Sequence, residues 1–169
     1  GAKTAITYQV QDITGQKVTS TLTPTVPPAP VATNDTSTGA YDTNQTITIL
    51  TNDTAGAGAT LVTGSVKLCA TTATVNASCS LSTLTVANEG TYTVNANGTV
   101  TFDPLPTFKG VASAVKYIVA DSTGRTDDAT IIPTVTAPAV PVATAQSKSV
   151  IPGASVAFTT LTGTGGLAT

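Results

Sequence analysis

Residues 90–103, GTYTVNANGTVTFD, contain the clearest secondary-structure signal of the chain. Apolar side chains alternate with threonine or another polar residue on both halves, as they do on strands that bury one face. Tyr92 and Phe102 occupy apolar positions of this alternation, and Asn97-Gly98 is a residue pair that tolerates the positive φ of a tight turn. The stretch therefore predicts a β-hairpin.

The same alternation recurs on both sides of this hairpin, separated by turn residues, and no long segment has the periodicity of a helix. About seven or eight short strands in roughly 110 residues predict an all-β, antiparallel, Ig-like β-sandwich. Further strands are expected at residues 45–50, 65–69, 79–86, 115–120 and 129–135. We expect an aliphatic core completed by the larger side chains of Tyr41, Tyr92, Phe102, Phe108 and Tyr117.

The chain also repeats itself. Residues 7–26, TYQVQDITGQKVTSTLTPTV, return 109 positions later as residues 116–135, KYIVADSTGRTDDATIIPTV. The tetrapeptide at 30–33, PVAT, returns at 141–144, now 111 positions later. A period this long indicates a tandem array of whole domains, because solenoid repeats are typically about 20 to 50 residues long.

The repeat predicts three parts of the chain. Residues 1–28 are interpreted as the end of a preceding repeat with its linker, 29–137 as one complete repeat, and 138–169 as a linker and the start of a following repeat. Proline-rich segments at 26–33 and 136–144 predict stiff, extended linkers, because proline fixes φ. The two incomplete ends are expected to pair with neighbouring chains or to dangle.

Composition limits the function classes. Threonine is the most common residue, only 9% of residues are charged, and the net charge is −2, so there is no basic surface for nucleic acid. No apolar run approaches the roughly 20 residues that span a bilayer, so no membrane insertion is expected. No signal peptide or cell-wall anchor is visible, and both are expected to lie outside these 169 residues.

The two cysteines, Cys69 and Cys79, predict a local disulfide. Two cysteines in a chain without histidine cannot complete a four-ligand zinc site, and the CxxC redox spacing is absent. A disulfide implies an oxidising, extracellular setting. The alternative is a pair of buried free thiols.

Catalysis finds little support in the sequence, and we expect no enzymatic activity. Without histidine there is no Ser/His or Cys/His arrangement. Asp127 and Asp128 are adjacent, so on a strand they point to opposite faces and cannot act as a paired acid and base.

Calcium is the one ligand that the sequence suggests, although no cofactor is required. Asp35 follows the first proline-rich linker, and Asn52-Asp53 follows a predicted strand, so their oxygen atoms could gather at a domain junction. Asp12 and Asp121, in predicted hairpin turns, could contribute. The alternative is that Asn-Asp-Thr forms Asx turns without a metal.

Residues 90–136 resemble the CshA-type fibril repeat of Gram-positive surface adhesins, a bacterial Ig-like or cadherin-like stalk repeat. The residues that carry this resemblance are Gly90, Tyr92, Val100, Phe102, Pro104, Phe108, Gly110, Tyr117, Val119, Asp121, Pro133, Thr134 and Val135. Residues 1–26 resemble the end of a preceding copy. The half of the repeat upstream of residue 90 is similar to the opening of many bacterial stalk domains.

The resemblance implies a secreted, wall-attached fibril at the bacterial cell surface, in which the repeat is a rigid spacer that projects an adhesive tip. It also implies that the partners are neighbouring repeats of the same or adjacent chains. Many such stalks carry isopeptide bonds, but Glu89 is the only glutamate that could assist one, and none is predicted. The alternatives are an adhesive module for a host matrix protein or glycan, and a subunit that assembles end to end or laterally into an extracellular filament.

Overall fold

The computed structural model describes residues 2–70, 79–157 and 163–164, and the regular elements of these ranges are strands. No helix of the described residues is long and apolar enough to cross a membrane. The strands are β1 (Ile6–Gln11), β2 (Lys17–Leu22), β3 (Asp35–Gly39), β4 (Gln45–Ile47), β5 (Leu61–Cys69), β6 (Cys79–Leu81), β7 (Thr83–Val86), β8 (Gly90–Val94), β9 (Val100–Pro104), β10 (Gly110–Val111), β11 (Val115–Asp121), β12 (Thr126–Val135), β13 (Val142–Ala143) and β14 (Gly163–Thr164). The all-β prediction is confirmed.

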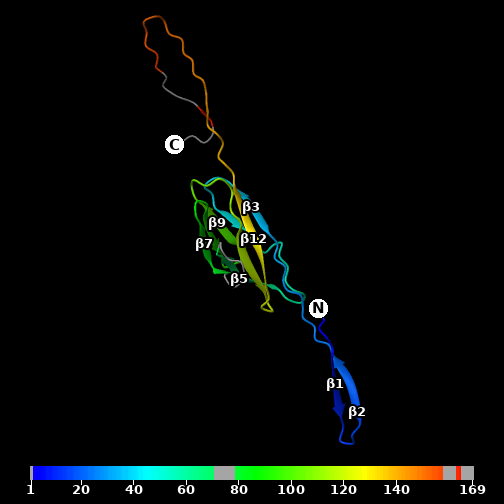
Figure 1. Ribbon diagram of the computed structural model, residues 1–169. Coiled ribbons are helices and arrows are strands. Elements are labelled where there is room, and N and C mark those ends of the chain that lie inside the picture. Colours follow the sequence, from blue (N-terminus) through cyan, green and yellow to red (C-terminus); the bar gives the residue numbers. More distant parts are fainter. Residues whose placement is uncertain (1, 71–78, 158–162, 165–169) are drawn as a thin grey trace.

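Strands β3 to β12 form a sandwich of two sheets, here called the central sandwich (Figure 1). In the described residues, one sheet has six strands in the order β10-β12-β11-β5-β6, with β3 also paired to β12, and the other has four in the order β4-β9-β8-β7. The hairpins β8–β9 and β11–β12 are the ones that the sequence predicts.

Other strands of the central sandwich differ in detail from those that the sequence pattern predicts. The predicted strand at 79–86 is two strands, because β6 pairs with β5 in one sheet and β7 pairs with β8 in the other. The chain therefore changes sheets near Ser82 while keeping its apolar alternation. The short strands β3 and β10 carry few apolar residues, which is why the pattern does not predict them.

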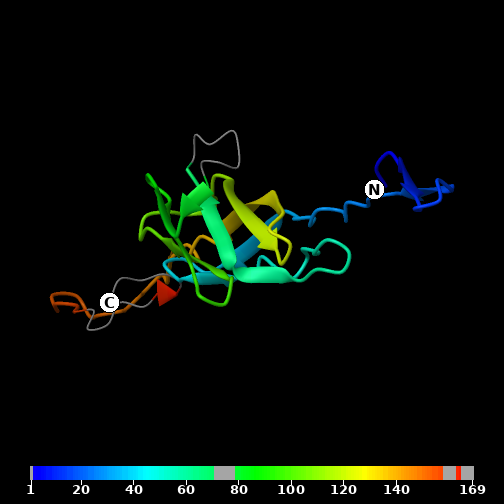
Figure 2. The same cartoon turned by 90° about the horizontal axis from the view of Figure 1, so that it is seen from below.

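One pairing of the central sandwich is parallel. Strand β3 lies alongside β12 with Asp35 opposite Ile131 and Gly39 opposite Val135. The chain enters the sandwich along β3 and leaves it along β12 in the same direction, so the two linkers leave from opposite ends. Figures 1 and 2 both show the hairpin β1–β2 beyond one end and the C-terminal segment beyond the other.

The core lies between the two sheets and contains the large side chains that the sequence suggests. Tyr92 and Phe102 are fully buried with ring centroids 4.6 Å apart, and Phe108 meets the edge of Phe102 at 6.3 Å. Tyr117 is fully buried in the six-stranded sheet. Tyr41 and Phe108 pack against this cluster and stay partly exposed.

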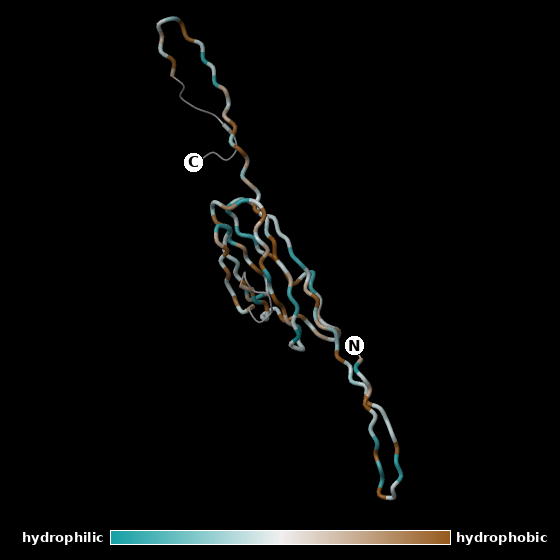
Figure 3. Tube along the Cα trace, in the orientation of Figure 1, coloured by the Kyte–Doolittle hydropathy of each residue, from teal (hydrophilic) through white to brown (hydrophobic). Residues whose placement is uncertain are grey.

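The hairpin β1–β2 has the same register as β11–β12. Tyr8 lies opposite Ser20 in the first hairpin, and Tyr117 lies opposite Ala129 in the second, 109 positions later in both strands. Within the described residues β1 and β2 pair only with each other. Tyr8 is therefore 51% exposed, whereas Tyr117 is 0% exposed. Figure 3 shows apolar residues along this isolated hairpin as well as in the central sandwich.

The turns of the two hairpins also match. Asp12 Oδ1 accepts hydrogen bonds from the Thr14 amide and hydroxyl at 2.8 and 2.7 Å. Asp121 Oδ1 accepts the corresponding bonds from Thr123 at 2.9 and 2.5 Å. These hydrogen bonds lower the pKa of both carboxyl groups. Both aspartates thus serve their own turns, as carboxylates in Asx turns do.

We expect Phe102→Ala to lower the free energy of unfolding of the central sandwich by about 3–5 kcal/mol, because it leaves a cavity between two other aromatic rings. Denaturant unfolding followed by circular dichroism measures this loss. Val111→Ala is the control, because Val111 is exposed on β10 and its truncation should change stability by less than about 0.5 kcal/mol. Equal effects of the two substitutions would contradict the assignment of the core.

Candidate functional site

The first linker, residues 26–33, is fastened to the end of the central sandwich by its backbone. Val31 and Thr54 exchange two backbone hydrogen bonds of 2.8 and 2.9 Å. The Ala32 amide donates to Asp127 Oδ2 at 2.9 Å, and the Thr33 amide donates to Asp53 Oδ1 at 2.7 Å. The loop after β4 and the start of β12 thus hold three successive linker residues.

Close approach between the linker and this loop depends on Gly56. A Cβ atom at Gly56 would lie 2.1 Å from the backbone oxygen of Pro28 and 2.9 Å from Asp121 Oδ2. Real Cβ atoms essentially never approach backbone oxygen this closely, so any larger residue would displace the linker. The junction between linker and sandwich is therefore a packed contact and not a loose tether.

Two buried carboxyl groups lie behind this junction. Asp35 and Asp53 are each 8% exposed. The Tyr117 hydroxyl lies 3.1 Å from Asp53 Oδ1 and 2.9 Å from Asp53 Oδ2, and it donates its proton to this carboxylate. Asp35 Oδ2 is buried and accepts no hydrogen bond from the described residues. The three side chains come from β3, the loop after β4, and β11.

Burial is the main cause of the unusual electrostatics at this place. It raises the pKa of Asp35 to about 6 against the opposing effect of the Tyr117 hydroxyl and the Asn52 amide, and the nearby charge of Asp53 adds to the rise. Burial also raises the pKa of Asp53, although the Thr33 amide and the Tyr117 hydroxyl oppose it by hydrogen bonding to the carboxylate. The pKa of the Tyr117 hydroxyl is raised by burial and by both carboxylates.

The structure brings together only part of the predicted calcium set. Asp35 and Asp53 meet at the junction, but the Asn52 side-chain amide donates to the backbone oxygens of Thr33 and Asn34 at 3.4 and 3.3 Å. Asp12 belongs to the separate hairpin β1–β2. In the part of the chain that the structure describes, no three acidic, histidine or cysteine residues form a group that could hold a metal. Calcium binding stays a prediction.

Sequence reasoning treated Tyr117 as a core residue and missed its polar role. A buried tyrosine needs a partner for its hydroxyl, and that signal could have pointed to nearby acidic residues. Its partner Asp53 lies 64 positions earlier in the sequence, so only the fold identifies the pair.

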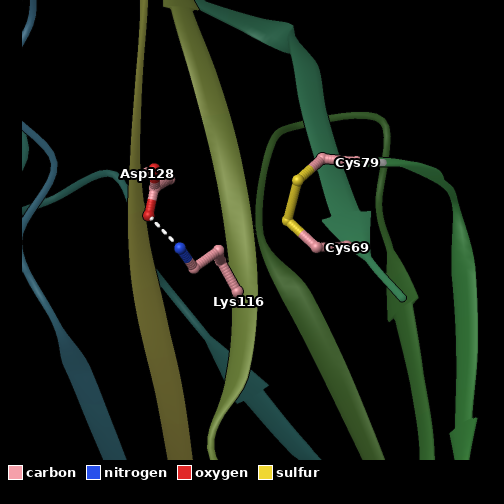
Figure 4. Close-up of a disulfide and its surroundings, with 4 residues drawn as sticks. All are labelled: Cys69, Cys79, Lys116 and Asp128. Carbon is pink, nitrogen blue, oxygen red and sulfur yellow. Dashed lines mark ion pairs between the residues drawn. A yellow bond between two sulfur atoms is a disulfide. The ribbon is translucent and has the colours of Figure 1, made fainter. Parts of the chain in front are cut away.

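A disulfide joins Cys69 at the end of β5 to Cys79 at the start of β6, where the two residues lie opposite each other (Figure 4). The structure thus contains the predicted bond. The bond closes the loop of residues 70–78, of which residues 71–78 lie outside the described residues. Figure 4 also shows the ion pair of Lys116 with Asp128 at 2.8 Å, which is partly exposed and so contributes little to stability.

The two adjacent aspartates predicted to diverge on their strand contact different groups. Asp127 accepts a hydrogen bond from the Ala32 amide of the linker, and Asp128 forms an ion pair with Lys116. A surface hollow of about 260 Å³ lies elsewhere, between the segment that follows β4, strand β5 and the turn of the β8–β9 hairpin. Its lining contains uncharged residues only: Thr48, Leu50, Thr51, Thr63, Asn97, Gly98 and Thr99.

Residues 27–135 match the family described as the surface adhesin CshA repetitive domain. The chain belongs to this family. The match begins at the first linker and ends at the last residue of β12, so it covers the junction and the whole central sandwich. No curated protein matches the chain. Membership of the CshA repeat family identifies a repeat of a surface adhesin, with an extracellular position at the cell surface.

We expect Gly56→Ala to loosen the junction, because the new methyl group would clash with the Pro28 backbone oxygen. Hydrogen exchange of the Val31 and Thr33 amides, measured by NMR, should become roughly tenfold faster or more. Gly64→Ala is a matched control, because a Cβ atom there meets nothing within 4 Å. Unchanged exchange in Gly56→Ala would show that the linker is not held by this contact.

The double substitution Cys69→Ala/Cys79→Ala should lower the free energy of unfolding by about 2.5–3 kcal/mol, because it restores the conformational freedom of a short unfolded loop. Urea unfolding with and without reductant measures the effect. Reductant should destabilise the wild type by a similar amount and leave the double variant unchanged. Alkylation of both cysteines in the unreduced native protein would contradict the bond.

Proposed function

We propose that this chain is a segment of a stalk in which tandem CshA repeats act as rigid spacers and project an adhesive tip from a wall-attached fibril. The observation that carries the proposal is the parallel pairing of β3 with β12. Since the first and last strands of the sandwich run the same way, each repeat adds its length to the stalk. An antiparallel arrangement of these strands would return the chain to its starting end.

The linkers support a stiff connection between repeats. Prolines restrict the backbone of residues 26–33, and loop and strand residues bind this linker at Val31, Ala32 and Thr33. A segment that is both intrinsically stiff and fastened to the next domain allows little bending. Stiffness is what a spacer requires.

Tandem repetition is supported by both flanks of the central sandwich. Hairpin β1–β2 has the register, the turn and the apolar positions of β11–β12, so we infer that it closes a preceding repeat. On the other side, Gly153 and Asp42, 111 positions apart, both have a positive φ, of 86° and 52°, and PVAT recurs at the same interval. We infer that residues after 138 open a following repeat.

The partners that we propose are neighbouring repeats, and we propose no catalytic role. The apolar side chains of β1–β2 are exposed here at positions that are buried in β11–β12, so the missing partner surface is the remainder of a sandwich. The central sandwich itself presents an uncharged hollow and threonine-rich strands. Saturable binding of a single repeat to a host glycan or matrix protein would favour the adhesive-module alternative instead.

A hybrid protein tests the proposal directly. Residues 29–114 joined to residues 6–169 place β1–β2 where the β11–β12 hairpin would follow, because residue 6 is equivalent to residue 115. We expect two folded repeats, with amides of residues 6–22 strongly protected from exchange in the hybrid and weakly protected in the 169-residue chain. Hydrogen exchange by mass spectrometry reports on these residues, and small-angle scattering should show a longer rod.

Tyr8→Ala provides the matched control for this experiment. In the hybrid, Tyr8 takes the buried place of Tyr117, so its removal should destabilise the upstream repeat by about 3–5 kcal/mol. In the 169-residue chain the same substitution should leave the central sandwich unchanged, because Tyr8 lies in the separate hairpin. Equally fast exchange of residues 6–22 in both proteins would overturn the tandem interpretation.

A further inference from the structure

The group of oxygen atoms around the Tyr117 hydroxyl contains too few hydrogen-bond donors. Both oxygens of Asp53 and the backbone oxygens of Thr33 and Ile49 lie within 2.9–3.4 Å of this hydroxyl. The hydroxyl supplies one proton, the Thr33 amide supplies a second to Asp53, and the Asn52 amide supplies a third to the Thr33 oxygen. Asp35 Oδ2, buried nearby, receives none. A buried acceptor without a donor costs free energy, so this site favours an additional proton.

Among the residues that the structure describes, no lysine or arginine forms a salt bridge with either of the two carboxyl groups. Asp35 faces Asp53 and Tyr117, and Asp53 also faces Asp127, which is itself acidic. Among the described residues the salt bridge of Lys116 engages Asp128 and neither of the buried pair. Two nearby carboxylates in a buried setting cannot both remain ionised at low cost, and one of them takes up a proton more easily than a free carboxyl group.

The hydrogen bonds indicate which residue takes the proton. Asp53 accepts the Thr33 amide and the Tyr117 hydroxyl, and both of these stabilise its ionised form. Asp35 has a buried oxygen that accepts nothing and would gain a donor by protonation. Tyr117 and Asn52 lie near Asp35 and oppose the rise of its pKa, but burial outweighs them. The unpartnered oxygen thus favours Asp35 over Asp53 as the residue that takes the proton.

The chain itself provides a comparison. At the 111-residue interval of PVAT, Asp35 corresponds to Gln146 and Asp53 to Thr164. Both acids are thus replaced together by uncharged side chains that can donate hydrogen bonds. An amide at the position of Asp35 carries permanently the donor that a protonated carboxyl group would supply.

We propose that Asp35 and Asp53 form a proton-binding site in the folded repeat, where one proton on Asp35 relieves the charge repulsion and strengthens the attachment of the linker. The site is in direct contact with the linker, because Asp53 accepts a hydrogen bond from the Thr33 amide. Protonation therefore couples the pH of the surroundings to the stability of the repeat at its junction with the preceding one.

The direction of the pH effect follows from linkage. The pKa of Asp35 is raised from an ordinary 3.8 to about 6, so between these values the folded repeat binds more protons than the unfolded chain. The free energy of unfolding should therefore rise as pH falls below about 6, and this contribution of Asp35 should disappear as pH rises above 6. The lowered pKa of Asp121 acts oppositely and reduces stability only below its ordinary value.

The test is the unfolding of the 169-residue chain at pH 7.5 and pH 5.0, with chelator present throughout. The unfolding equilibrium constant of the wild type should be roughly tenfold smaller at pH 5.0, which corresponds to a melting temperature several degrees higher. Asp35→Asn supplies a permanent neutral donor and should lose most of this pH dependence, and the raised pKa of Asp53 accounts for the remainder. Asp103→Asn removes a charge from an exposed position on β9 and should keep it.

A second measurement does not depend on any variant folding. Carboxyl carbon shifts of the wild type, followed by NMR, should show one buried aspartate that titrates near pH 6. Titration of every aspartate near or below pH 4 would overturn the proposal, as would equal pH dependence in Asp35→Asn and the wild type. Stabilisation by millimolar calcium at pH 7.5, reversed by chelator, would show that a cation and not a proton satisfies the site, and would overturn it as well.

Discussion

The parallel pairing of β3 with β12 determines where the chain enters and leaves the CshA repeat. Neighbouring strands of a sheet joined by short turns run antiparallel, so a parallel pair requires strands that are far apart in the sequence. Here the pair joins the first and last strands of the central sandwich, and the intervening strands form the rest of both sheets. The exit of the two linkers at opposite ends of the sandwich, and with it the elongated arrangement of the chain (Figure 1), follows from this one pairing.

The junction shows how a domain with few charges holds its linker. Three backbone amides of the linker donate to oxygens of the sandwich, from the Thr54 carbonyl and from Asp53 and Asp127. In the other direction, the Thr54 amide, the Asn52 amide and the Tyr117 hydroxyl donate to carbonyl oxygens of the linker. Carboxylates form stronger hydrogen bonds with amides than neutral acceptors do, but removing them from water costs free energy, and so does placing two of them close together. The buried Asp35 and Asp53 are the consequence of placing such acceptors at a packed contact.

Local sequence was enough to predict the hairpins and the fold class. Alternating apolar residues and turn residues such as Asn97-Gly98 act over a few positions, so β8–β9 and β11–β12 could be identified directly. The internal repeat identified β1–β2 by the same means. The parallel pairing could not be predicted, because nothing in residues 35–39 indicates a partner 96 positions away at residues 131–135. The prediction of a single strand at residues 79–86 differs from the structure for a similar reason. Apolar and polar residues go on alternating where the chain passes from one sheet to the other, so the pattern does not show the change.

The candidate site was predictable only in part. Asp35, Asn52 and Asp53 stood out as oxygen-bearing residues near a linker, and the fold brings the two acids close to one hydroxyl. Their burial and the shortage of donors depend on Tyr117 from a distant strand, which periodicity assigned to the core alone. The disulfide was easier to predict, because two cysteines in one short segment can form only one intramolecular bond.

The pairing of β3 with β12 also determines how the repeat responds to mechanical tension. When the two linkers are pulled apart, the load acts along both strands, which lie side by side over the five residue pairs from Asp35–Ile131 to Gly39–Val135. The backbone hydrogen bonds of this pairing are then loaded in shear and must break together, instead of opening one after another like a zipper. A repeat built in this way resists being unravelled by flow past the cell that carries it.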